Sequence, residues 1–253
     1  MKAKKSNFIE WNNNIFISSI KKIDLNIILI VILDTLFYLL SGYFVIFWLQ
    51  RIQAKMASFS LPTDIISLGP EKAQQLVSEV KTFYYLIILS FVLLLIAVIF
   101  LASILKGIIW AKTINTKITF KLISKFLGLN LIWMGFWLVL VILISLLVEP
   151  ASAPKFIIIA MTLGLYFTNT LYALFMKKPE FKSIFYAIKL NITKIHLFLL
   201  PYTIIALTLF IIVRLVSLLK FQYSNILLGL ILIIYAAIAR YYVSALVLDI
   251  KKS

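Results

Sequence analysis

Asp34 and Arg240 are the ionisable residues that lie deepest in the apolar runs of this 253-residue chain. Asp34 lies about nine residues into the first run, which is roughly 14 Å deep for a helix that rises 1.5 Å per residue. Arg240 lies about ten residues before the end of the last run, at a similar depth. Charges inside hydrocarbon are costly and are therefore paired or functional. We predict an Asp34–Arg240 ion pair that joins the first and last spans.

Asn169 lies at a comparable level in the fourth apolar run, between two threonines. Together with Asp34 and Arg240 it predicts a polar layer inside the membrane, in the inner leaflet. Two interpretations of this layer remain open. It is either a gate or substrate site that faces a cytoplasmic cavity, or a sealed ion pair that sets the register of the helices.

The remaining ionisable residues of the spans indicate no chemistry. Lys106 and Arg214 lie near span ends, and we expect their long side chains to extend to the interface. His196 begins the fifth run and is the single histidine, so a multi-histidine metal site is excluded. The absence of cysteine excludes disulfides and cysteine-ligated zinc.

The motifs of common enzymes are absent from the sequence. It contains no GxxxxGK[ST], GxGxxG, HExxH or GxSxG pattern. Asp34 is the one acid deep in a span, whereas metal-dependent hydrolysis needs several converging ligands. An intramembrane protease needs a nucleophile with its base, or two aspartates. We therefore predict a protein that is not an enzyme and that binds no metal or cofactor.

Six long apolar runs must position these residues. The chain is 63% hydrophobic and only 13% charged, whereas a soluble domain has roughly 25% charged residues. A helix needs roughly 20 apolar residues to cross a bilayer, and its backbone groups must be satisfied within the span. The runs cover residues 25–49, 83–110, 127–148, 156–176, 197–219 and 226–250. We predict an all-α integral membrane protein with six transmembrane helices. Pro70, followed by acids, predicts a helix start that runs on into the second span.

The connections between the runs alternate in charge. On the side of the two termini the sequence places Lys2, Lys4, Lys5, Lys21, Lys22, Lys106, Lys112, Lys117, Lys121, Lys125, Lys177, Lys178, Lys182, Lys189, Lys194, Lys251 and Lys252. The opposite side carries six basic residues and four acids: Arg51, Lys55, Lys72, Lys81, Lys155, Lys220, Asp64, Glu71, Glu79 and Glu149. The positive-inside rule then predicts a multi-pass cell-membrane protein with both termini in the cytoplasm. Because the net charge of +16 is concentrated between apolar runs, we expect anionic lipid headgroups as partners and no nucleic acid.

Three basic amphipathic segments each lead into a span. They lie around Phe16–Ile23, at Ile114–Phe126 and at Phe181–Ile195. We predict three in-plane helices on the cytoplasmic side. Each would precede a pair of spans, which divides the single domain 1–253 into repeat units 6–111, 112–178 and 179–250. These helices are either a collar that faces lipid or a partner, or simple linkers between spans.

The segment FKSIFYAIKLNITKIHLFLLPYTIIALTLF, Phe181 to Phe210, best shows this pattern of an amphipathic helix followed by a span. The pattern resembles a group of prokaryotic six-helix membrane proteins that includes the membrane domain attached to some glycerophosphodiester phosphodiesterases. The resemblance implies architecture only. The acidic metal-binding residues of the phosphodiesterase domain have no counterpart here, so no activity is carried over.

These observations lead to two hypotheses about function. The first is a non-enzymatic protein that interacts with lipid or acts as an accessory or assembly factor, in which case it has a protein partner that the sequence does not identify. The alternative is a small transporter or channel subunit with a polar site facing the cytoplasm. Single glycines in the spans, without prolines beside them, do not favour the broken helices of transporters.

Overall fold

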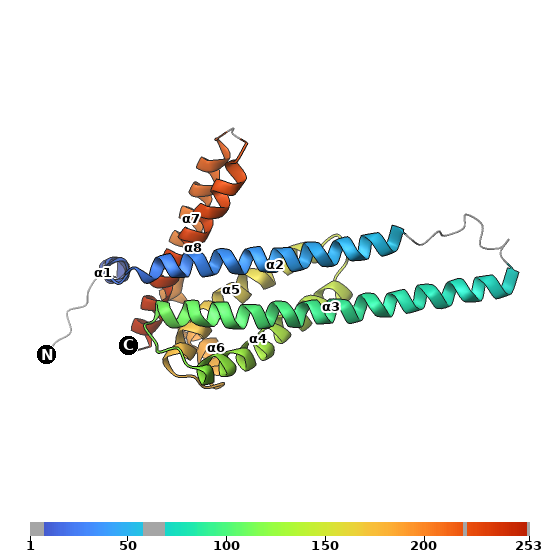
Figure 1. The fold of residues 1–253 in the computed structure, drawn as a ribbon. Coiled ribbons are helices and arrows are strands. Elements are labelled where there is room, and N and C mark those ends of the chain that lie inside the picture. The colour runs from blue at the N-terminus through green and yellow to red at the C-terminus, as the bar shows by residue number, and fades with distance from the viewer. Residues whose placement is uncertain (1–7, 58–68, 220–221, 252–253) are drawn as a thin grey trace. The chain divides into compact units, whose positions relative to one another are not determined.

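The computed structural model describes residues 8–57, 69–219 and 222–251, and these ranges form eight helices and no strand (Figure 1). Two helices are short, namely α1 (Phe8–Lys21) and α6 (Ser183–Thr193). The six long helices are α2 (Asn26–Ala57), α3 (Gly69–Thr113), α4 (Phe120–Leu147), α5 (Ala153–Lys177), α7 (Ile195–Ser217) and α8 (Ser224–Ile250).

Each of the six long helices is long and apolar enough to cross a membrane. The prediction of an all-helical, multi-pass membrane protein is therefore confirmed. The predicted helix start at Pro70 is also confirmed, because α3 begins at Gly69 and runs for 45 residues without a break. Gly69 has a φ of +73°, a conformation that glycine adopts without steric cost.

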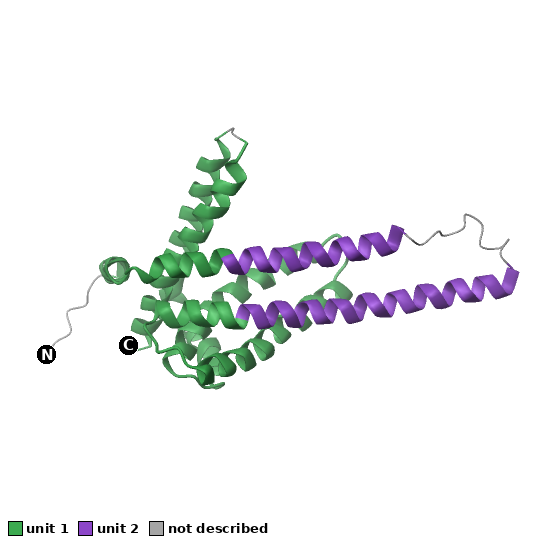
Figure 2. Cartoon of the chain, viewed as in Figure 1, with its two compact units in different colours: residues 1–35, 103–253 green, residues 36–102 purple. Residues whose placement is uncertain are grey.

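The chain divides into two compact units (Figure 2). Unit 2, residues 36–102, contains the second part of α2 and the first part of α3. Within it the indole Nε1 of Trp48 donates a hydrogen bond of 3.0 Å to the Ser90 hydroxyl, and the Trp48 ring lies 5.7 Å from the Phe91 ring. Unit 1, residues 1–35 and 103–253, holds all the other helices and every residue of the candidate site. The single domain and its three repeat units stay predictions.

The core of unit 1 lies at one end of its helices. Every side chain from Leu171 to Met176 in α5 is buried, as are those from Tyr241 to Ser244 in α8. The α4–α5 and α7–α8 pairs are exposed at their other ends, where Leu147 is 80% exposed and Ile226 is 63% exposed. Lipid tails are as apolar as leucine, so these exposed ends need no protein partner. The end of unit 1 that contains the core is called the terminal face below, and consists of α1, residues 114–121, residues 177–182, α6 and residues 248–251.

The prediction of a separate amphipathic helix over Ile114–Phe126 is wrong. Asn115 has a φ of 56°, and the Thr116 amide donates to the Ala111 carbonyl at 2.8 Å. This left-handed cap with its backbone hydrogen bond terminates α3. Thr119 then caps α4, since its side chain accepts from the Leu122 amide. Lys121 and Lys125 of this segment belong to the first part of α4, whereas Lys117 precedes that helix.

The other two predicted segments form helices of their own. Helix α1 packs against α8, and α6 packs against α5 and α7. Their orientation in the plane of a membrane, and the threefold repeat, stay predictions.

Replacing Gly107 by valine is expected to destabilise unit 1 by about 1–3 kcal/mol, the usual cost of overpacking. A Cβ atom at this position would lie 3.0 Å from the Ile123 Cδ1 atom and 3.1 Å from the Phe126 Cδ1 atom, both in α4. Thermal unfolding of the purified protein in detergent measures the effect. Gly135→Val is the matched control, because a Cβ atom there meets nothing within 4 Å. Equal melting temperatures for the two variants would contradict the close α3–α4 contact.

Candidate functional site

A three-charge cluster lies inside the spans of unit 1. The Asp34 carboxylate of α2, which is 1% exposed, accepts from the Lys106 ammonium of α3 at 2.5 Å and from the Arg240 guanidinium of α8 at 2.9 Å. The guanidinium also lies 5.7 Å from the centroid of the Trp110 ring. Charge-assisted hydrogen bonds of this kind are about twice as strong as neutral ones. The cluster therefore ties together the first, second and last long helices.

The structure brings together Asp34 and Arg240, which are 206 positions apart. The expectation that Lys106 extends to the interface is wrong, because its ammonium group binds the Asp34 carboxylate and its side chain is only 16% exposed. For the Lys106 ammonium group, an ionised carboxylate within reach is a better partner than water at a greater distance. The expectation for Arg214 stays a prediction, although its guanidinium lies 5.1 Å from the Phe210 ring centroid.

Asn169 lies in α5 and is half-buried. The ion-pair partners of the Asp34 carboxylate are Lys106 and Arg240. The fully buried amide of this region is Asn130, which donates to the Ser103 hydroxyl at 3.0 Å and accepts from the Tyr172 hydroxyl at 2.5 Å. No sequence motif marks Asn130, although it is a polar residue only three positions into the third apolar run. The Asp34–Arg240 pair is present, and a single polar layer that includes Asn169 stays a prediction.

A second buried amide joins α6 to α5. Asn191 of α6 is fully buried, and its side-chain oxygen accepts from the Thr170 hydroxyl at 2.8 Å. Its backbone carbonyl accepts from the Tyr166 hydroxyl at 3.1 Å. These contacts hold α6 against the end of α5, next to the lysines that follow α5.

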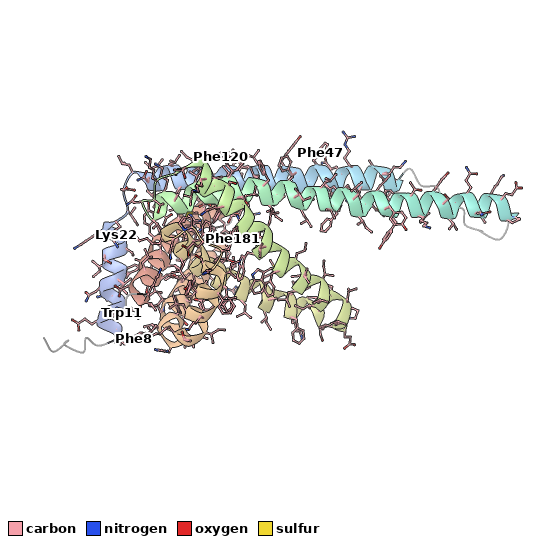
Figure 3. All side chains as sticks on the ribbon, turned by 90° about the horizontal axis from the view of Figure 1, so that it is seen from below. Phe8, Trp11, Lys22, Phe47, Phe120 and Phe181 are labelled. Atoms are coloured by element: carbon pink, nitrogen blue, oxygen red, sulfur yellow. The ribbon has the colours of Figure 1, made fainter. Side chains whose placement is uncertain are left out.

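Helix α1 is held against the last turns of α8. The Trp11 indole donates to the Asp249 carboxylate at 2.8 Å, and the Tyr242 hydroxyl donates to the Asn12 side chain at 3.3 Å. The ring of Phe16 meets that of Tyr242 edge to face. Figure 3 shows Trp11 and Phe8 at one end of α1 and Lys22 just beyond the other. Docking of α1 thereby places Lys22 near the ends of α5 and α8.

A cavity of about 570 Å³ lies between α1, the end of α5 and the end of α8. Four of its lining residues are lysines: Lys22, Lys177, Lys178 and Lys251. Its one acidic residue is Asp249, whose carboxylate accepts the hydrogen bond from Trp11. Clefts lined by charges of one sign concentrate ions of the opposite sign. We call this space the α1 cavity.

A second cavity of about 450 Å³ lies on the side of α6 and shares Lys178 and Lys251 with the first. It adds Lys189 and the acid Glu180, whose carboxylate lies 3.2 Å from the Lys178 ammonium. Ser183 and Tyr186 of α6 supply hydroxyl groups to its lining. We call this space the α6 cavity.

The chemistry of the two cavities is that of anion binding. Lysine ammonium groups act as compact point charges with three donors each, and they bind phosphate groups. Among the described residues no group of three or more histidine, cysteine or acidic side chains could hold a metal ion. Neither cavity is lined by a member of the buried charge cluster.

The clustering of lysines between apolar runs is evident from the sequence, but these two cavities are not. The lysines that meet there come from three distant parts of the chain, around positions 22, 178 and 251. No local pattern connects them, since α1 docking and the packing of α5 against α8 bring them together.

No protein-family model, curated protein or solved structure matches this chain. The resemblance to six-helix prokaryotic membrane proteins therefore stays a prediction.

Replacing Asp34 by asparagine is expected to destabilise the fold by about 3–5 kcal/mol, because two buried cations then lose their carboxylate. Denaturant unfolding in mixed micelles measures the loss. Asp24→Asn is the control, since Asp24 is exposed and asparagine keeps its capping ability. Combining Asp34→Asn with Arg240→Gln should cost less than the sum of the single changes. Additive losses would show that the two side chains do not interact.

Proposed function

We propose that the protein is a non-enzymatic cell-membrane protein that binds the headgroups of anionic phospholipids at its terminal face. The α1 cavity carries this proposal, because four lysines line a space of headgroup size. In this proposal the terminal face and both termini are cytoplasmic, the orientation that the lysine distribution favours. Juxtamembrane lysines attract anionic lipids, with about 1 kcal/mol for each residue near the surface.

The exposed surfaces of α1 and α6 support this proposal. Helix α1 exposes Ile9 at 66% and Ile20 at 45%, and α6 exposes Phe185 at 80% and Ile192 at 62%. Both helices also carry or adjoin the cavity lysines. Apolar residues beside lysines on short helices are typical of segments that lie at the headgroup boundary.

We propose binding rather than catalysis because of what the cavities offer a phosphate group. Ammonium groups neutralise and hold a phosphate, but a reaction also needs an activated nucleophile or a general base in reach of it. The two carboxylates of the cavities are already engaged, Asp249 by the Trp11 indole and Glu180 by the Lys178 ammonium. An accessory or assembly role is compatible with lipid binding and would involve a protein partner on the same face.

The buried charge cluster favours a second candidate function, that of a small transporter or channel subunit. Ionisable groups at membrane depth often mark substrate or ion pathways. In this case Asp34, Lys106 and Arg240 would form a polar site open to the cytoplasm. The burial of Asp34 and Arg240, whose side chains are 1% and 9% exposed, argues for a sealed cluster instead.

Changing Lys177, Lys178 and Lys251 together to glutamine is expected to weaken phosphatidylglycerol binding by about a hundredfold, from about 1 kcal/mol per lysine. Titration of the detergent-solubilised protein with short-chain phosphatidylglycerol, followed by native mass spectrometry, measures the affinity. Phosphatidylcholine, which has no net charge, should bind weakly to both proteins.

The control for this experiment changes Lys117, Lys121 and Lys182 to glutamine. These three exposed lysines lie on the terminal face but line neither cavity. The change in net charge is the same, so a diffuse surface effect would weaken binding equally in both variants. Equal weakening would contradict a headgroup site in the cavities.

Single cysteines at Ser18 and Ser103 separate the two candidate functions. The natural chain has no cysteine. Ser18 lines the α1 cavity, whereas Ser103 is fully buried and accepts the Asn130 hydrogen bond. A membrane-impermeant thiol reagent should label Ser18→Cys in inverted vesicles but not in intact cells, and should leave Ser103→Cys unlabelled in both. Labelling of Ser103→Cys from the cytoplasm would favour a water-filled pathway, and labelling of Ser18→Cys in intact cells would reverse the proposed orientation.

A further inference from the structure

The α1 cavity and the α6 cavity adjoin each other at two shared lysines. Lys178 and Lys251 line both spaces, so an ion in either cavity is close to the same ammonium groups. Lys178 follows the end of α5, and Lys251 follows the end of α8. The ends of α5 and α8 therefore lie between the two cavities, which share these two lysines.

Each cavity is large enough for a headgroup of its own. Volumes of about 570 and 450 Å³ fall within the roughly 300–1,000 Å³ that is typical of small-molecule sites. Their remaining lysines differ, since Lys22 and Lys177 belong to the α1 cavity and Lys189 belongs to the α6 cavity. The pair thus offers two separate phosphate positions with a shared pair of cations between them.

The charges of the combined site suit a dianion. Five different lysines face two carboxylates, those of Asp249 and Glu180, which leaves a net charge of +3. The Asp249 carboxylate accepts from Trp11, and Glu180 is paired with Lys178. A lipid with one phosphodiester carries a single negative charge and would leave most of this charge without a counter-ion.

Apolar surface lies on both sides of the combined site. Ile15 and Leu248 contribute to the lining of the α1 cavity, and Leu174 and Leu190 contribute to that of the α6 cavity. On α6, Tyr186 lines its cavity and is 59% exposed. Ile15 and Leu174 are buried, whereas Leu248 and Leu190 are half-buried. An acyl chain that leaves the α1 cavity can therefore contact Leu248, and one that leaves the α6 cavity can contact Leu190 and Tyr186.

We propose that the two cavities form one site for a lipid with two phosphodiester groups on a single headgroup, the chemistry of diphosphatidylglycerol. This inference rests on the proposed function and specifies its ligand class. One phosphate occupies the α1 cavity beside Lys22 and Lys177, and the other occupies the α6 cavity beside Lys189. Lys178 and Lys251 lie between the two phosphates and contact both.

A single linked ligand suits this arrangement better than two separate lipids. Two independent lipids would each have to be held in place, whereas a linked second phosphate binds intramolecularly at a high effective concentration. A basic pocket at the ends of membrane helices is also a known setting for recognition of such headgroups. We therefore expect diphosphatidylglycerol to bind at least tenfold more tightly than phosphatidylglycerol when both are supplied at equal phosphate concentration.

The affinity ratio of the two lipids tests the inference. Native mass spectrometry of the detergent-solubilised full chain gives both affinities, and phosphatidylglycerol binding alone tests the proposed function. A ratio near one with intact phosphatidylglycerol binding would overturn the two-phosphate site and leave the proposed function standing. Failure of both lipids to bind would overturn both.

Single substitutions locate the two phosphates. Lys189→Gln removes a cation from the α6 cavity only, and Lys177→Gln removes one from the α1 cavity only. Each should lower the affinity for diphosphatidylglycerol by about fivefold and should affect phosphatidylglycerol less, because this lipid can use the other cavity. Lys182→Gln makes the same change in charge outside both cavities and should alter neither affinity. Equal losses for both lipids in the Lys189 and Lys177 variants would overturn the two-phosphate assignment.

Inorganic pyrophosphate distinguishes a lipid from a soluble diphosphate as the occupant. The lipid assignment predicts that pyrophosphate displaces diphosphatidylglycerol only at concentrations far above that of the lipid, because it lacks the acyl chains that contact the apolar lining. Displacement at equal concentration would show that the phosphates alone determine binding, and it would overturn the lipid assignment.

Discussion

The Asp34 carboxylate imposes the strongest constraint on this fold. The Asp34 side chain is only 1% exposed, and a buried charge has to be neutralised within the protein. Lys106 and Arg240 supply the opposite charges from α3 and α8. The beginning of α2, the end of α3 and the last helix therefore have to meet at one level. Breaking one contact would leave a buried cation, so the cluster constrains how these three helices meet.

The terminal face follows from this meeting point. Beyond Arg240, α8 continues through buried residues to Asp249, which accepts the hydrogen bond that docks α1. The α5 residues from Leu171 to Met176 pack into the same core, and the lysines that follow them line the cavities. Buried amides at Asn130 and Asn191 add hydrogen bonds between neighbouring helices. A well-packed core at this end supports a basic surface. At the other ends of the α4–α5 and α7–α8 pairs, we expect lipid to cover the exposed apolar side chains.

Local sequence signals predicted part of this structure and misled at two places. The apolar periodicity of Ile114–Phe126 indicated a helix, yet Asn115 terminates α3 and Thr119 starts α4. Both residue types are recognised cap signals, and they mark the end of one helix and the start of the next within this segment. Lys106 was expected to turn toward the interface because it lies near a span end. Its direction depends on Asp34, which is 72 positions away and invisible to any local rule.

The sequence by itself determined the six helices long and apolar enough to span a membrane, and the concentration of lysines on one side of them. Insertion into a bilayer depends on transfer free energies that add up along each segment, so a linear pattern is sufficient. It also indicated Asp34 and Arg240, because isolated charges in apolar runs are visible in one dimension. Only the tertiary structure decided that Lys22, Lys178 and Lys251 surround one cavity and that the Asn130 side chain meets Ser103 and Tyr172. These contacts depend on how the helices pack against one another. The packing energy arises between residues that are far apart in the sequence, so no local pattern reveals it.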